Sequence, residues 1–101
     1  MKPIQKLKQW AEDYDSNLRC DDPRFKRVVM LQHIDGTSLT FVKAFAVRYP
    51  MPEPFEHDFL VIFTEHHGWH WYDPEDLNAW YQFAGEYEPA ETIEIEPRKD
   101  E

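Results

Sequence analysis

Apolar side chains near the start of the chain recur at three- and four-residue spacing: Ile4, Leu7, Ala11, Tyr14 and Leu18. This spacing places them on one face of an amphipathic helix. Pro3 suits the first helical turn, where a backbone N–H would have no intrahelical partner. The sequence therefore predicts a helix from Pro3 to about Tyr14 or Asp15, followed by a loop over residues 16–24.

Two runs rich in β-branched and aromatic residues, 25–34 and 37–49, flank the dipeptide Asp35-Gly36. Asp-Gly favours a two-residue type I′ turn, so the runs predict an antiparallel hairpin that pairs Ile34 with Thr37. Both faces of this hairpin carry apolar residues. That pattern predicts a position in the centre of a sheet, or cover on both faces.

The next segment predicts a stiff, extended connection because it carries a proline at every second position: Pro50, Pro52 and Pro54. Strands are predicted at 59–65 and 69–72, joined by a turn at His67-Gly68. With this turn, Glu65 lies opposite His70 across the hairpin.

A second helix is predicted after Tyr72. Asp73-Pro74-Glu75-Asp76 combines a capping carboxylate, a proline and further acids, as helix starts do. An apolar stripe continues from it and stops at Gly85: Leu77, Trp80, Tyr81 and Ala84. Residues 92–96 alternate as a half-buried edge strand, and residues 97–101 are expected to fray.

The predicted order of elements is α-β-β-β-β-α-β. It indicates an α+β fold in a single small domain over residues 1–101, with a mainly antiparallel sheet and helices packed on one face. A small, partly closed β-barrel with flanking helices is the alternative, because Trp69 and Trp71 lie on a short strand before a tight turn.

Charge is distributed unevenly along the chain. Residues 1–52 hold nine Lys or Arg and six Asp or Glu, whereas residues 53–101 hold two and fourteen, within a formal net charge of −9. Such a field favours a basic partner and disfavours nucleic acid or an anionic membrane. We expect the bases of the first hairpin to pair with the acidic half: Arg24, Lys26, Arg27, Lys43 and Arg48.

Cys20 is the single cysteine, so no intrachain disulfide forms, which fits a reducing compartment. No N-terminal apolar segment resembles a signal peptide, and the longest apolar run, 59–63, is too short to cross a bilayer. The expected location is cytoplasmic. Aromatic residues make up 16% of the chain, which is enough for some rings to form a surface contact or a homodimer.

Histidine and glutamate gather at the second predicted turn, where metal ligands are possible: Glu65, His66, His67 and His70, with His57 at the start of the preceding strand. Zinc needs three or four converging ligands. The predicted turn aligns Glu65 with His70 but points His66 to the other face, so a plain turn with a cross-strand ion pair is favoured and no metal site is predicted. The weak candidates for metal ligands are Glu65, His66 and His70.

No catalytic residues are predicted. The serines and glycines are isolated, so neither an activated nucleophile nor a phosphate-binding loop is indicated. His33, beside the Asp-Gly turn, is expected to be solvated. We expect no enzyme activity and no cofactor.

The function predicted from these patterns is a small acidic protein-interaction module, an inhibitor or nucleic-acid mimic that docks a basic protein. The expected aromatic anchors are Trp69, Trp71, Trp80 and Tyr81. The expected acidic contacts are Asp73, Glu75, Asp76, Glu86, Glu88, Glu94 and Glu96. A metal- or ligand-binding domain built on the histidine cluster, or a homo-oligomeric accessory domain, is the alternative.

Overall fold

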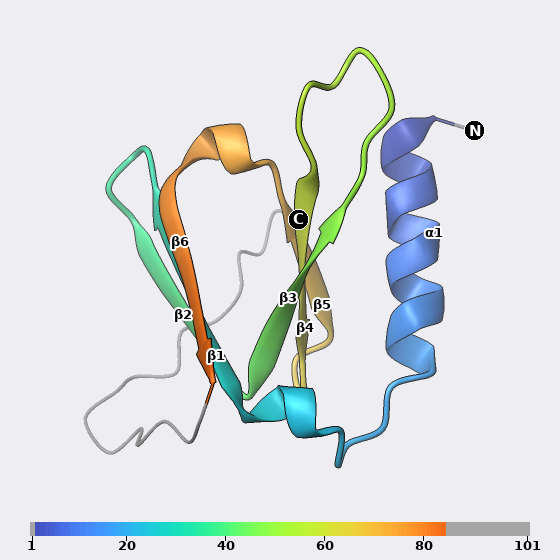
Figure 1. Ribbon diagram of the computed structural model, residues 1–101, viewed down its shortest axis with the longest axis vertical. Helices are drawn as coiled ribbons and strands as arrows, with labels where there is room; N and C mark the ends of the chain where they lie inside the picture. The colour runs from blue at the N-terminus through green and yellow to red at the C-terminus, as the bar shows by residue number, and fades with distance from the viewer. Residues whose placement is uncertain (1, 85–101) are drawn as a thin grey trace.

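The computed structural model describes residues 2–84, which form one helix and six strands (Figure 1). The helix is α1 (Pro3–Ser16), and the strands are β1 (Arg27–His33), β2 (Ser38–Val42), β3 (Ala44–Tyr49), β4 (Phe59–Thr64), β5 (Trp69–Tyr72) and β6 (Leu77–Ala84). Two short 3₁₀ turns, η1 (Pro23–Lys26) and η2 (Pro74–Asp76), precede β1 and β6. No helix among the described residues has the length and apolar character needed to cross a bilayer.

The strands form two antiparallel three-stranded sheets, in the orders β2-β1-β6 and β3-β4-β5. Neither sheet closes into a barrel, so the fold is the predicted α+β class and not the barrel alternative. Figure 1 shows three layers: the β2-β1-β6 sheet, the β3-β4-β5 sheet, and α1 on the far side of the second sheet. β1 is the central strand of its sheet, whereas β2, the next strand of the predicted hairpin, lies at the edge.

A double-sided core holds these layers together, and β4 lies at its centre because all six of its residues are buried. Leu60 and Ile62 join an apolar cluster between the two sheets, with Val29, Leu31, Leu39, Phe41, Ala44 and Tyr72. The intervening residues of β4 face α1 instead, in a cluster with Leu7, Ala11, Phe25 and Phe45. Alternation along β4 therefore attaches one layer to each of its faces.

The predicted strand 37–49 is two strands, which is a correction. The chain bends at Lys43, whose φ of 53° is unusual for a residue other than glycine. β2 before this bend pairs with β1, and β3 after it pairs with β4. The Lys43 carbonyl accepts a hydrogen bond from the Glu65 N–H at 3.0 Å, which fixes the corner against the end of β4.

The predicted register of the first hairpin is wrong by one residue. Three residues, 34–36, form the loop: the His33 N–H donates to the Thr37 carbonyl at 2.8 Å, and Gly36 has a φ of 93°. A three-residue loop of this kind places glycine in the left-handed region. The shift pairs Leu31 with Leu39, and both side chains are buried between the sheets.

The predicted second helix is also wrong. The helix-start sequence makes only the single turn η2, in which the Asp73 carboxylate accepts the Glu75 N–H at 2.9 Å. Residues 77–84 then form β6, paired along β1. Pairing with β1 satisfies the backbone of β6, and alternation turns Trp80 toward the core while Tyr81 remains 54% exposed. Tertiary pairing thus overrides the helical stripe.

Several predictions lie outside the described residues: the helix end at Gly85, the strand at 92–96 and the frayed tail at 97–101.

The buried aromatic residues of β4 should dominate stability. Phe63 is fully buried against α1, so Phe63→Ala should lower the free energy of unfolding by about 3–5 kcal/mol. The matched control is Phe83→Ala, since Phe83 is 43% exposed, and its cost should be below about 1 kcal/mol. Denaturant unfolding measures both values. Equal losses in the two variants would contradict the layered core.

Candidate functional site

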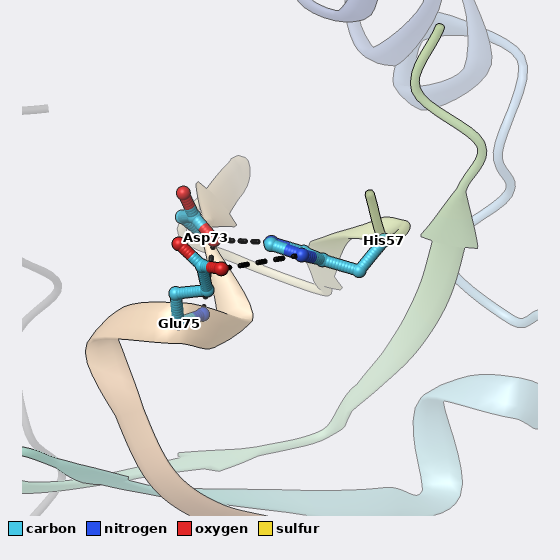
Figure 2. A group of neighbouring side chains, drawn as sticks. All are labelled: His57, Asp73 and Glu75. Atoms are coloured by element: carbon cyan, nitrogen blue, oxygen red, sulfur yellow. Dashed lines mark hydrogen bonds and ion pairs between the residues drawn. The ribbon is translucent and has the colours of Figure 1, made fainter. Parts of the chain in front are cut away.

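Two segments far apart in the sequence meet at His57 (Figure 2). The imidazole Nε2 lies 2.7 Å from Asp73 Oδ1, and Nδ1 lies 3.7 Å from Glu75 Oε2. One ligand atom from each of the three residues lies within 4.8 Å of those of the other two. Figure 2 shows the imidazole edge pointing at both carboxylates, which come from the turn that follows β5.

The antiparallel pairing of β4 and β5 creates this meeting. Leu60 pairs with Tyr72, so the residues just before β4 lie beside those just after β5. The His57 ring stacks on Phe59, with ring centroids 5.9 Å apart and an angle of 21° between the planes. Asp73 is held by its capping bond to the Glu75 N–H. Both partners are therefore fixed by local structure before any ligand is present.

Charge at this site favours the protonated imidazole. The hydrogen bond to Asp73 raises the pKa of His57, and the charges of Asp73, Glu75 and Glu56 act in the same direction against partial desolvation. In its protonated form His57 is an imidazolium clamp that links the 50–58 connection to the turn at η2. Chemically, one imidazole nitrogen and two carboxylates also make a ligand set for a divalent transition metal.

The predicted alignment of Glu65 with His70 is wrong. Residues 65–67 form the loop between Thr64 and Gly68, so Ile62 pairs with His70 and Phe63 pairs with Trp69. The Thr64 hydroxyl stabilises this longer loop, because it accepts the His67 N–H at 2.7 Å and donates to the Gly68 carbonyl at 2.9 Å.

The histidines of this loop do not converge on one point. The Glu65 carboxylate contacts His66 at 2.9 Å and Lys43 at 3.9 Å. His70 instead stacks on Phe41, with its Nε2 3.0 Å from the His67 carbonyl oxygen. Within residues 2–84, the three side chains whose possible metal-ligand atoms converge are His57, Asp73 and Glu75. The sequence analysis had grouped His57 with the histidines of the 65–67 loop instead.

His33 is also placed differently from the prediction. It is 4% exposed rather than solvated, and its ring packs edge-on against Tyr72 at 5.7 Å. Strand alternation puts His33 on the same face as Leu31, and the second sheet covers that face.

The predicted aromatic anchors lie on different surfaces. The Trp69 indole donates to Glu12 at 2.9 Å, and Trp71 stacks on Phe59 at 5.6 Å, both beside the α1 layer. Trp80 packs against the cluster between the sheets, with the Arg48 guanidinium 5.3 Å from its ring centroid. These three side chains are half-buried, whereas Tyr81 is exposed. They do not form one contiguous patch.

Three loops gather carboxylates at one end of the molecule. The 34–36 loop joins η2 through a bond from the Ile34 N–H to the Asp76 carbonyl at 3.0 Å, and His57 ties the 53–58 segment to the same turn. Figure 1 shows these segments at the same end. We call this surface the acidic end; its members are Asp35, Glu53, Glu56, Asp58, Asp73, Glu75 and Asp76. The predicted acidic contacts Glu86, Glu88, Glu94 and Glu96 lie outside the described residues.

Among the described residues, one base of the first hairpin pairs with the acidic half as expected and another does not. Arg24 pairs with Asp22 at 2.8 Å and Arg19 pairs with Asp21 at 3.3 Å, both close in sequence. The pairing of Lys43 with Glu65 fits the expectation. η1 and the corner at Lys43 lie at the end opposite the acidic end in Figure 1.

A depression of about 450 Å³ lies at the end of α1, lined by Trp10, Asp13, Tyr14, Asn17, Leu18 and Arg24. Its cation is already engaged: the Arg24 guanidinium donates to both Asp22 oxygens and, at 2.6 Å, to the Tyr14 hydroxyl. The bonds from the Arg24 side chain, together with one from the Arg24 backbone N–H, lower the pKa of Asp22 to about 2. Arg24 thus serves to anchor η1, and the depression is a weaker candidate than the His57 site.

The imidazolium clamp should make stability depend on pH. Asp73→Asn keeps a capping oxygen for the Glu75 N–H but removes the charge that faces His57. Because the folded pKa of His57 is raised above 6.5, its stabilisation is complete below pH 6.5 and is lost as pH rises through the folded value. The difference in unfolding free energy between wild type and Asp73→Asn should therefore shrink from pH 5.5 to pH 9, measured by denaturant unfolding. A difference that is constant or grows with pH would contradict the clamp.

Comparison with protein-family models, with curated proteins and with solved structures finds no match for this chain. A functional assignment therefore depends on the chemistry and geometry of the acidic end and of His57 within it.

Proposed function

We propose that this protein is a small interaction module that docks a basic protein through its acidic end. The observation that carries the proposal is the gathering of seven carboxylates from three loops that contain no lysine or arginine. α1 begins at the same end in Figure 1 with Lys2 and Lys6, so the carboxylates outnumber the nearby bases. The proposed partner, a basic protein surface, is the one expected from the sequence, and Asp73, Glu75 and Asp76 are retained from the predicted contacts.

The exposure of these carboxylates supports a role in association. Six of the seven are exposed, and Asp73 is half-buried as the ligand of His57. In physiological salt the Debye length is about 8 Å, so neighbouring exposed carboxylates on one end reinforce each other's field. Such a field speeds the encounter with a basic surface and disfavours acidic competitors.

An apolar anchor lies within the acidic end. Ile34 is 61% exposed at the tip of the β1–β2 loop, next to Asp76 through its backbone hydrogen bond. Met51 and Phe55, in the connection that carries His57, are half-buried. Apolar groups surrounded by polar residues supply most of the binding energy in many protein interfaces. Ile34 therefore joins Tyr81 as a candidate anchor.

Removal of charge from the acidic end should abolish partner capture. The variant Glu53→Gln/Glu56→Gln/Asp58→Asn removes three exposed charges without touching Asp73 or Glu75. The immobilised wild type should retain a basic protein from native extract at low salt, and this variant should not. For the captured partner, the variant should slow association about 10-fold or more at low ionic strength, measured by surface plasmon resonance.

The matched control is Glu12→Gln/Asp13→Asn/Asp21→Asn, which removes the same number of exposed charges away from the acidic end. It should capture the partner at the wild-type rate. Light scattering and melting temperatures should show that all three proteins are folded and equal in oligomeric state. Equal association rates for the two variants would refute docking through the acidic end, because total charge alone would then explain the binding.

A further inference from the structure

We propose that His57, Asp73 and Glu75 form a binding site for a divalent transition-metal ion, with zinc as the ion that the ligand set fits. The proposal goes beyond the docking function and does not depend on it. It stands on the convergence of three ligand atoms, within 4.8 Å of one another, from two segments that the fold brings together (Figure 2).

The present distances are close to those of a metal site. Zinc binds imidazole nitrogen and carboxylate oxygen at about 2.0–2.2 Å, so two ligands of one tetrahedral ion lie about 3.3 Å apart. His57 Nε2 and Asp73 Oδ1 are 2.7 Å apart, at hydrogen-bond distance, and must separate by less than 1 Å to admit an ion. The ion would take the place of the imidazole proton.

Two of the three ligands are fixed and the third can adjust. His57 and Asp73 are each 29% exposed; the first is stacked on Phe59 and the second is held by the capping bond to the Glu75 N–H. The Glu75 side chain is 73% exposed, so it can rotate to bring an oxygen to the ion. Three protein ligands leave a coordination position open for water or for a group on a partner.

The ligand chemistry distinguishes the ion. Magnesium and calcium favour sites built from oxygen alone, whereas an imidazole nitrogen favours zinc and its neighbours in the transition series. The other carboxylates of the acidic end concentrate cations around the site without selecting among them. Zinc should therefore bind in the presence of excess magnesium.

The test is isothermal titration of the full chain with zinc chloride in a buffer containing millimolar magnesium and free of chelators. The wild type should bind one zinc ion per chain, and zinc should raise its melting temperature. His57→Gln should weaken binding at least 10-fold. Asp73→Asn should also weaken zinc binding. Because this variant keeps the capping oxygen of η2, it shows whether a loss of binding in His57→Gln comes from misfolding.

The matched control is His66→Gln/His67→Gln, which removes two exposed histidines from the loop that the sequence suggested. It should bind zinc as the wild type does. Absence of binding heat and of a melting shift in the wild type would overturn the proposal, leaving His57 as a protonated clamp only. Wild-type affinity in His57→Gln, or its loss in the control, would also overturn it, because the ion would then bind elsewhere. Partner capture repeated in a chelator tests the docking function separately.

Discussion

The fold depends on the burial of β4 on both faces. Its six residues contain no charge and none is exposed, so one layer must cover each side of the sheet that contains it. The β2-β1-β6 sheet covers the face of Leu60 and Ile62, and α1 covers the face of Val61 and Phe63. The bend at Lys43 makes this arrangement possible because it carries one continuous apolar stretch from the first sheet into the second.

The same arrangement creates the acidic end. Antiparallel pairing brings the start of β4 and the end of β5 to one edge, and the β1–β2 loop reaches that edge through its bond to Asp76. The carboxylates lie on loops, where no core contact restricts them. The His57 side chain connects two of these loops, because it contacts the carboxylates of both Asp73 and Glu75. A proton on the His57 imidazole stabilises the fold through these contacts. A metal ion would bind the same imidazole and carboxylate atoms.

The sequence predicted elements with strong periodicity and missed features set by tertiary contacts. The helix at α1 and the strands β4 and β5 follow from their own residue patterns. The one-residue register shift at Asp35-Gly36 could not be predicted, because the dipeptide is compatible with both a two- and a three-residue loop. The apolar stripe of residues 77–84 fits a helix as well as a strand, and these residues form β6 because their backbone pairs with β1. The His57 site was missed because Asp73 and Glu75 follow His57 by sixteen residues or more, and only the β4–β5 register brings them to it.

The proposed arrangement places three loops on one anionic surface around His57. Paramagnetic broadening of backbone amide signals by substoichiometric Mn²⁺ tests it most directly, since Mn²⁺ accepts carboxylate and imidazole ligands. Amides in 34–36, 53–58 and 73–76 should broaden together, while those around η1 and Lys43 should remain sharp. Broadening centred on 65–70, or spread evenly over the carboxylates of the chain, would contradict the claim.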